Sequence, residues 1–295
     1  GGKMINSGLI VNQGFEFMLY STPVQTKDFT FDLNINLSRN VSKVKELADG
    51  VDYLFFNGDA NFPINVGTRV GHRLGEIYAK NLYKRDENGN MIVNKQGRPT
   101  KVSGEDAFQY TLDHPIGNIE PDLLMFVSPS FTYKGFTLSA LFDMKFGGDI
   151  VSVSEAMATS TGLAARTANR GNAENGWKIV APGVTADGTV NSTAMNAQRY
   201  YTSMSGMAEE FVYDASFIKL KELSLGYSFP KSILKKTPLT SLNVAFVARN
   251  LAYLMKHTPG TSPEGGYDTS MFSQAIDYMS VPYTRTFGLS INLGF

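Results

Sequence analysis

The sequence predicts an all-β fold, an antiparallel transmembrane β-barrel segment with long extracellular loops. Three observations support this prediction. Apolar and polar residues alternate with a period of two over stretches longer than a usual soluble strand. Short and long connections between these stretches alternate along the chain, as in outer-membrane barrels. Only 18% of the 295 residues are charged, against about 25% in soluble domains.

The clearest alternation lies in residues 28–38, DFTFDLNINLS. Every second residue from Phe29 to Leu37 is apolar, and the residues between them are polar, so this segment is a two-faced strand. Residues 9–20 precede it and predict a partner strand, with a short link at 21–27.

Five further strands are predicted downstream. Residues 125–133 and 136–146 form a hairpin around the tight turn Lys134-Gly135. Residues 217–229 form a strand with a bulge near Lys221-Glu222, where the alternation slips. The set is completed by strands at 242–254 and 284–295.

The long connections fall at about 84–122, 147–215 and 255–282. Residues 51–56 are the one candidate for a descending strand between 40 and 71, and residues 40–47 predict a helical turn. Residues 84–101 predict a small hairpin outside the barrel wall, with turns at Asn88-Gly89 and Gln96-Gly97. About nine strands result, an odd number, and we expect the remaining strands of the barrel upstream.

Composition excludes several classes of protein. Lys+Arg and Asp+Glu both number 27, and no basic stripe indicates a nucleic-acid binder. The absence of Cys excludes a disulfide scaffold and thiolate metal sites. The chain opens on GGKMINSG without a signal peptide, as expected of a fragment.

Five motifs in order resemble the SusC/RagA family of TonB-dependent (TonB-linked) outer-membrane transporters of Bacteroidetes. The first motif consists of two stretches, NSGLIVNQGFEFML and KDFTFDLNINLSRNVSKVKEL, which together resemble paired mid-barrel strands of the family. The others are IGNIEPDLLMFVSPSFTYKGFTLSALFDMKFGGDI, DASFIKLKELSLGYSFP, ARNLAYLMKHTPGTSPE and VPYTRTFGLSINLGF. The chain departs from the family at Thr258 and Ser262, where members carry Tyr and Asp before the Pro-Glu pair.

This resemblance implies that residues 1–295 are the C-terminal part of a barrel of about 22 strands. The plug domain, the TonB box and the signal peptide are absent from these residues. It also implies import of glycans or peptides across the outer membrane, with a SusD-like lipoprotein as partner and energy supplied through TonB-ExbB-ExbD. Pro263-Glu264 and Arg285 match the family pattern, and we expect them to order the last outer loop.

Catalysis is not predicted. The three histidines, His72, His114 and His257, belong to no recognisable catalytic motif, and no cofactor is expected. The segment from Asp86 to Asn90 has the oxygen spacing of a calcium loop but lacks its glycine and its final glutamate, so a hairpin turn is favoured over a metal site.

Aromatic residues in the outer loops are candidate ligand contacts, because sugar rings stack on aromatic faces. The alternatives are packing between loops, contact with the lipoprotein, and an aromatic belt at the membrane surface. The candidates are Trp177, Tyr200, Tyr201 and Tyr267.

Polar residues of the strands are predicted to line the lumen. A charged side chain that faces lipid costs about 2–4 kcal/mol at the bilayer midplane, so the polar face must point inward. The lumen-lining residues are Asp32, Asn34, Asn36, Asp143, Lys145 and Arg249.

The last strand is predicted to face lipid and to close the barrel by pairing with its first strand. We expect that first strand to lie outside these residues. The barrel-closing residues are Phe287, Leu289, Ile291, Leu293 and Phe295.

The leading hypothesis is therefore part of a SusC-like importer in the outer membrane of a Gram-negative, Bacteroidetes-like cell. One alternative is a passive porin or an adhesin barrel, which upstream sequence would separate from a transporter. The other is a soluble all-β glycan-binding module, whose apolar faces would have to meet in a dry core between two sheets.

Overall fold

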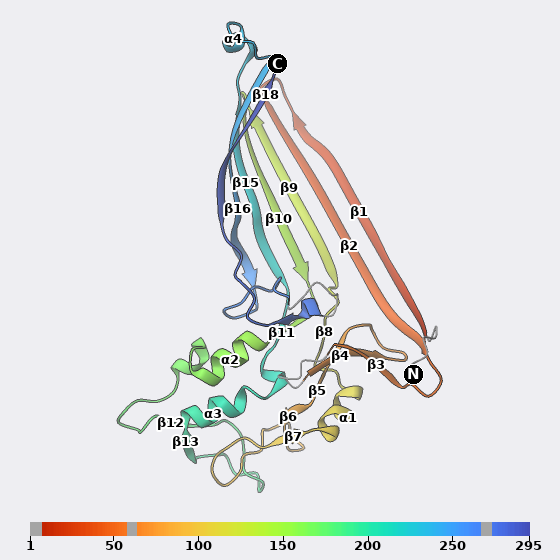
Figure 1. Cartoon of the computed structure of the whole chain (residues 1–295), viewed down its shortest axis with the longest axis vertical. Coiled ribbons are helices and arrows are strands. Elements are labelled where there is room, and N and C mark those ends of the chain that lie inside the picture. The colour runs from red at the N-terminus through yellow and green to blue at the C-terminus, as the bar shows by residue number, and fades with distance from the viewer. Residues whose placement is uncertain (1–7, 58–63, 267–272) are drawn as a thin grey trace, which may run out of the picture.

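The structure, a computed structural model, describes residues 8–57, 64–266 and 273–295. It consists of a large sheet of long strands and a loop region of short strands and helices at one end of that sheet (Figure 1). The opposite end carries the short connections and the C-terminus (Figure 1).

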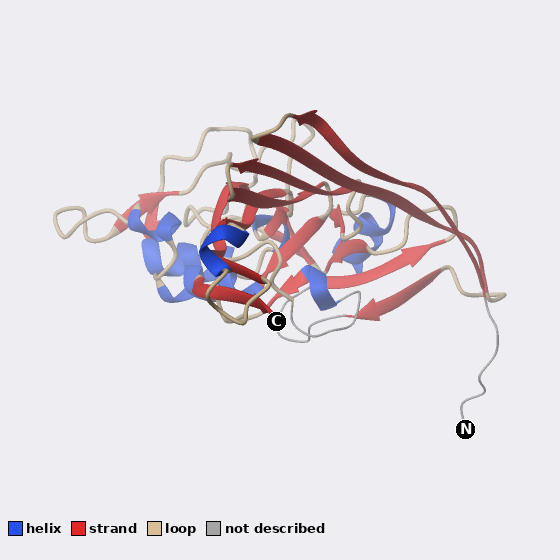
Figure 2. Cartoon of the chain, turned by 90° about the horizontal axis from the view of Figure 1, so that it is seen from above, coloured by secondary structure: helices blue, strands red, loops and turns tan. Residues whose placement is uncertain are grey.

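The large sheet has seven strands, and each neighbouring pair is antiparallel. Its order follows the chain, and the sheet curves when seen from above (Figure 2). The strands in order are β1 (Gly8–Gln25), β2 (Phe29–Leu47), β9 (Leu123–Tyr133), β10 (Phe136–Phe146), β15 (Phe217–Ser228), β16 (Ser241–Lys256) and β18 (Thr286–Gly294).

Cross-strand register places apolar residues opposite one another on one face of this sheet. A single row of directly paired residues crosses all seven strands and is apolar throughout. Many of these side chains are exposed, Leu289 for example at 73%. A soluble sandwich would bury such a face, so this exposure argues against the soluble alternative. The row is Val24, Phe31, Phe131, Leu138, Leu225, Phe246 and Leu289.

The tight turn predicted at Lys134-Gly135 is confirmed. Lys134 has φ 46° and Gly135 has φ 89°, so both central residues adopt the left-handed conformation that two-residue hairpins favour. A second short connection, between β15 and β16, contains the helix α4 (Lys231–Leu234).

Among the described residues, the loop region contains four small sheets. The first comprises β3 (Tyr53–Asn57), β4 (Ile64–Arg69), β5 (Glu76–Ala79) and β8 (Gly117–Asn118). The second comprises β14 (Val212–Asp214), β11 (Asp149–Ser152) and β17 (Ile276–Asp277). The two-stranded sheets are β6 (Asn81–Tyr83) with β7 (Lys101–Ser103) and β12 (Lys178–Val180) with β13 (Ala194–Asn196).

Helices pack beside these small sheets. The α-helices are α1 (Glu105–Asp113), α2 (Val153–Thr161) and α3 (Ala197–Met204), and the 3-10 helices are η1 (Ala165–Ala168), η2 (Ala208–Glu210) and η3 (Ser273–Ala275). No helix in residues 8–57, 64–266 and 273–295 is long and apolar enough to cross a membrane.

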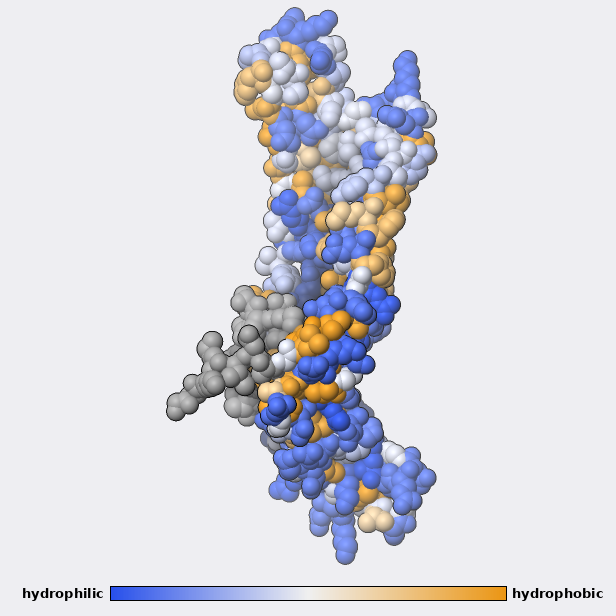
Figure 3. All heavy atoms as spheres, turned by 90° about the vertical axis from the view of Figure 1, so that its right-hand side faces the viewer, coloured by the Kyte–Doolittle hydropathy of each residue, from blue (hydrophilic) through white to orange (hydrophobic). Residues whose placement is uncertain are grey.

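The loop region has a hydrophobic core of its own. Phe211, Ile77, Val151 and Ile276 are essentially inaccessible to solvent and belong to one cluster, although they come from all three long connections. Hydrophilic residues cover most of the far end of this region (Figure 3). The long connections are therefore folded together rather than hanging separately from the sheet.

The segment from residue 40 to 57 differs from its sequence-based prediction. Residues 40–47 form no helical turn, since β2 continues to Leu47 and pairs with β1 along this length. Ser42 and Val44 are buried while Lys43 and Lys45 are exposed, which is the period of two of a strand. The three-residue spacing of Val41 and Val44 had suggested a helical turn instead.

The strand at residues 53–57 lies in the loop region instead of the wall. The large sheet consequently has seven described strands rather than about nine, and the first long connection begins after Leu47 rather than near residue 84. The two turns predicted in residues 84–101 are present, with Gly89 at φ 82° and Gly97 at φ 74°.

Candidate functional site

The six residues predicted to line a lumen share one face of the large sheet. Asn36 lies opposite Phe126, which lies opposite Asp143 on the next strand. Arg249 lies opposite Glu222. That this shared face lines a lumen stays a prediction. The six residues are Asp32, Asn34, Asn36, Asp143, Lys145 and Arg249.

The bulge predicted near Lys221-Glu222 is confirmed, because the pairing of β15 with β10 skips Lys221. Its Nζ lies 2.6 Å from Oδ2 of Asp143, which is only 8% exposed. The same ammonium lies 5.4 Å from the ring centre of Phe126. The extra residue thus supplies a cation to a carboxylate that would otherwise be buried without a charged partner.

A second polar cluster joins the last long connection to the sheet. Lys219 of β15 is 3% exposed, and its Nζ lies 2.6 Å from Oε2 of Glu264. The hydroxyl of Tyr253 donates to the same carboxylate oxygen and lies 2.7 Å from Oγ of Ser262. The ring centre of Tyr283 lies 4.6 Å from the Lys219 ammonium. Glu264 therefore holds its loop against β15 and β16.

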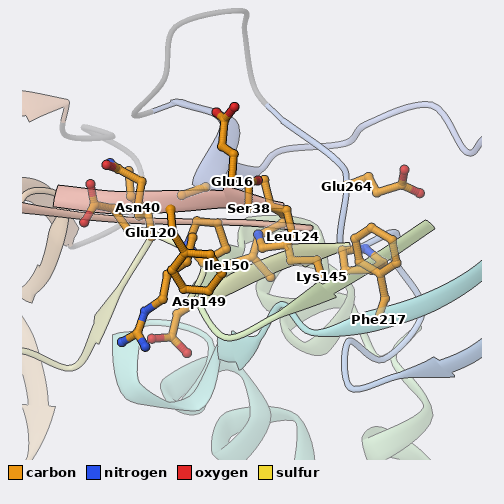
Figure 4. A pocket seen from close by; sticks show the side chains of 17 residues that line it. Glu16, Ser38, Asn40, Glu120, Leu124, Lys145, Asp149, Ile150, Phe217 and Glu264 are labelled. Atoms are coloured by element: carbon orange, nitrogen blue, oxygen red, sulfur yellow. The ribbon is translucent and has the colours of Figure 1, made fainter. Parts of the chain in front are cut away.

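A cavity of about 900 Å³ lies where the polar face meets the loop region (Figure 4). Strands β1, β2, β9, β10 and β15 contribute to its walls, together with residues of the long connections. Acidic groups outnumber basic ones in this lining, so the cavity is polar and acidic. Its charged residues are Glu16, Arg39, Glu120, Lys145, Asp149 and Glu264.

Asp149 sits in the wall of this cavity at the start of β11. Burial raises the pKa of its carboxyl, while the backbone N–H of Asn118, which donates to Oδ2 at 2.8 Å, lowers it. Asp149 also packs closely against Gly117, where an added Cβ would lie 2.9 Å from Oδ2. The carboxyl is thus fixed in place by the first and second long connections.

Arg166 organises a partly buried charge cluster in the loop region. Its guanidinium lies 3.7 Å from Glu155 and 3.1 Å from Glu210, and donates to the Tyr213 hydroxyl at 2.7 Å. It also lies 5.1 Å from the ring centre of Phe211. Burial raises the pKa of Glu155, and the neighbouring Arg166 opposes that shift.

The second and third long connections are tied together directly. Strand β17 pairs in parallel with β11, and the Ser152 hydroxyl donates to Oδ2 of Asp277 at 2.7 Å. Both residues are almost fully buried. Ser152 also caps α2 by accepting the backbone N–H of Glu155 at 3.1 Å.

Two of the predicted ligand contacts lie inside the protein instead of on its surface. Tyr200 and Tyr201 are 7% and 8% exposed and belong to the hydrophobic core of the loop region, because α3 turns its aromatic face inward. The Tyr201 hydroxyl donates to two backbone carbonyls, those of Arg166 and Asn169. Burial raises the pKa of Tyr200 to about 12. These contacts favour the packing alternative for both residues, and a ligand contact stays a prediction.

Trp177 does lie at the surface, with its side chain 50% exposed. Tyr267 lies outside the described residues. In the terminal segment, the apolar residues from Phe287 to Leu293 are exposed on the apolar face, and β18 pairs with β16. That this strand closes a barrel stays a prediction. The same holds for the barrel-closing role of Phe295, which is 81% exposed.

The predicted turn at Asp86 is present. Its carboxylate accepts the backbone N–H groups of Asn88 and Asn90 at 2.9 and 2.7 Å. Within the described ranges, no group of three or more His, Cys, Asp or Glu residues is placed to hold a metal ion. His72 lies 3.0 Å from Glu76 and His257 lies 3.7 Å from Asp214.

Sequence reasoning missed Lys219, Tyr253 and Arg166 as organising residues. Lys219 alternates with apolar neighbours in the β15 sequence, and this pattern indicates which face of the sheet it occupies. The pattern does not indicate its partner, Glu264, which lies 45 residues away. Arg166 carries no local signal, because its carboxylates come from an adjacent helix and a distant turn.

Comparison with known proteins identifies this architecture. No protein-family profile matches the chain. The TonB-dependent receptor P3 of Formosa agariphila is 28% identical, over 98% of this chain and 29% of the relative. The TonB-dependent receptor SusC of Bacteroides thetaiotaomicron is 27% identical, over 98% of this chain and 27% of the relative.

The chain is a homologue of the TonB-dependent receptors.

It spans less than a third of the length of these relatives. Among solved structures, the RagAB peptide importer in its closed-closed state superposes with a TM-score of 0.64 at 19% identity, over 98% of this chain and 30% of that one. The RagAB peptide transporter gives the same TM-score at 18% identity. The predicted resemblance to SusC and RagA and the all-β, antiparallel barrel-segment fold are therefore confirmed.

Proposed function

We propose that the chain forms part of an outer-membrane, TonB-dependent importer of glycans. The observation that supports this most is homology to TonB-dependent receptors over 98% of the chain, combined with a sheet that has one apolar and one polar face. The apolar row across seven strands fits contact with lipid, and the polar face fits a hydrated passage.

The site's chemistry suits hydroxyl-rich cargo. Its cavity carries carboxylates and backbone groups at the junction of the polar face and the loops, and carboxylates accept hydrogen bonds from sugar hydroxyls. Peptides are the alternative cargo, since the similar RagAB structures are those of a peptide importer. The relative named SusC supports assembly with a SusD-like lipoprotein, and the TonB-dependent relatives support energy coupling through TonB-ExbB-ExbD.

A passive porin or an adhesin is the competing proposal. The loop region supports the importer over a passive porin, because its shared core and buried ion pairs place a folded structure across one end of the sheet. Such a structure would narrow an open diffusion channel. In a TonB-dependent importer, energy from TonB can drive a conformational change that opens the passage.

Uptake of labelled oligosaccharides by intact cells tests the proposal. Cells that carry the whole receptor gene are compared with cells that lack it and with cells that lack TonB. We expect both deletions to abolish uptake, and the receptor to co-purify with a lipoprotein. Uptake that needs the receptor but continues without TonB would instead identify a passive porin.

A further inference from the structure

A second cavity, of about 720 Å³, lies in the loop region away from the polar face of the sheet. It is formed between the end of α2, the start of α3 and the segment that leads to β12, and these elements lie together in Figure 1. Trp177, Arg170 and Thr159 are among its lining residues. Neither the charge clusters nor the acidic cavity described above uses these three residues.

Trp177, the sole tryptophan of the chain, is held at this cavity in an uncommon conformation. Its φ is 56°, which non-glycine residues rarely adopt and which recurs at binding sites. The backbone N–H of Trp177 donates to the carbonyl of Asn172 at 2.8 Å, and its carbonyl accepts the N–H of Ala197 at 3.0 Å. The backbone is fixed while half of the indole side chain stays exposed, which suits a stacking surface.

The remainder of the lining offers hydrogen-bonding groups. Thr159 is fully buried, yet its hydroxyl oxygen has no hydrogen-bond partner among the described residues. Ser160, Thr161 and Gln198 place two more hydroxyls and an amide in the same lining. The Thr159 hydroxyl is closed off from solvent, so the exposed hydroxyl of Thr161 and the exposed amide of Gln198 are the groups that a polar ligand can reach.

Of the described residues that line this cavity, Arg170 is the one that carries a charge. It is exposed, and its guanidinium makes a single long hydrogen bond, 3.4 Å to the carbonyl of Gly162, within the described ranges. Among the described residues, no acidic side chain lines the cavity. The planar guanidinium is thus available to bind a carboxylate or a sulfate through two parallel hydrogen bonds.

We propose that this cavity is a binding site for a sugar ring that carries an anionic group. The ring stacks on Trp177, its hydroxyls bond to the threonine, serine and glutamine groups, and its carboxylate or sulfate pairs with Arg170. The inference rests on the proposed import of glycans for its biological role, and adds that the loop region binds an acidic sugar at a site separate from the acidic cavity.

Calorimetry on the whole receptor, purified in detergent, tests the site. The probes are a disaccharide of galacturonic acid, a sulfated galactose disaccharide and the unmodified galactose disaccharide. We expect the two acidic probes to bind about tenfold more tightly than the neutral one, which corresponds to one charge-assisted contact. A preference for only one acidic probe would show whether the carboxylate or the sulfate is the natural group.

Three variants and one control separate the contributions. Trp177→Ala should weaken all binding about tenfold or more, whereas Trp177→Phe should retain most of it. Arg170→Gln should remove the preference for acidic probes. Tyr110→Ala removes another exposed aromatic that does not line this cavity and should leave binding unchanged.

The proposal fails if the wild type binds none of the probes, if it binds neutral and acidic probes equally, or if Trp177→Ala binds like the wild type. Thermal unfolding checks that each variant is folded, and Trp177→Phe supplies a second, gentler variant at the key position. Because calorimetry needs neither TonB nor uptake, these failures leave the import proposal intact. Loss of TonB-dependent uptake in a receptor that still binds the probes would instead overturn the import proposal.

Discussion

The ammonium of Lys219 lies 2.6 Å from the carboxylate of Glu264, and the lysine is only 3% exposed. One residue belongs to a long strand of the sheet and the other to the last long connection. A buried ion pair of this kind contributes little net stability relative to apolar residues, but it is costly to break on one side only. The pair therefore fixes where the loop sits.

We predict that Glu264→Leu destabilises this junction by about 3–5 kcal/mol, because it leaves the Lys219 ammonium buried without its partner. Faster hydrogen exchange of the backbone amides of residues 257–266 would report the effect. The double variant with Lys219→Met should recover much of the loss. Glu222→Gln, at a more exposed pair with Arg249, should change little and serves as the matched control. Equal exchange in Glu264→Leu and wild type would contradict the prediction.

Adjacent residues of β18 should respond oppositely to the same substitution. Leu289→Arg places a charge on the apolar face and should reduce folding stability in lipid vesicles by about 2–4 kcal/mol if the site lies near the midplane. Ser290→Arg places the charge on the polar face and should be tolerated. Urea titration of both variants in vesicles measures the difference. Similar losses in both would contradict the assignment of the faces.

The loop core should be separable from the sheet. Phe211→Ala removes a fully buried ring and should destabilise the loop region by about 3–5 kcal/mol. We expect faster protease cleavage within residues 153–216, while the long strands remain resistant. Leu163→Ala, at an 83% exposed position nearby, is the control and should show wild-type cleavage. Simultaneous loss of the strands would show that loops and sheet fold as one unit.

The stability of α2 should depend on pH through Glu155. Burial raises its pKa above the ordinary value of 4.5, so the folded state binds this proton more tightly than the unfolded state does. The resulting stabilisation is complete below about pH 4.5 and is lost as pH rises through the raised pKa. Exchange protection of the α2 amides, corrected for intrinsic rates, should fall over this interval.

Two variants test the assignment to Glu155. Glu155→Gln should remove this part of the pH dependence. Glu174→Gln changes an exposed carboxylate of the same connection and should leave the pH profile as it is in the wild type. A profile unchanged in Glu155→Gln would assign the effect to another group.

The strands of the large sheet could be predicted from the sequence because each face has a constant chemical character. Residues 29–37 and 136–146 alternate cleanly, and the bulge at Lys221 showed as a break in that alternation. The continuation of β2 to Leu47 could not be predicted in this way, since Val44 is buried by loop residues rather than by a neighbouring strand face. Its backbone bonds to His72 and Gly71 show this contact.

The candidate site was less predictable. The polar face followed from the period of two, but the ion pairs of Lys219 and Arg166 depend on partners that are distant in sequence. The burial of Tyr200 and Tyr201 was not predicted, because an aromatic residue in a long connection suggests exposure. Here the long connections pack together into a hydrophobic core, and the aromatic side chains of these connections are buried in it.

The parallel pairing of β17 with β11, and the buried hydrogen bond between Ser152 and Asp277, limit how this protein can be re-engineered. A chimera that receives only the last connection from a relative would lose both contacts, because each has one partner in the preceding connection. Because the first long connection shares the same core, residues 48–122, 147–216 and 257–285 form a single exchangeable unit, and grafts of cargo specificity should transfer all three together.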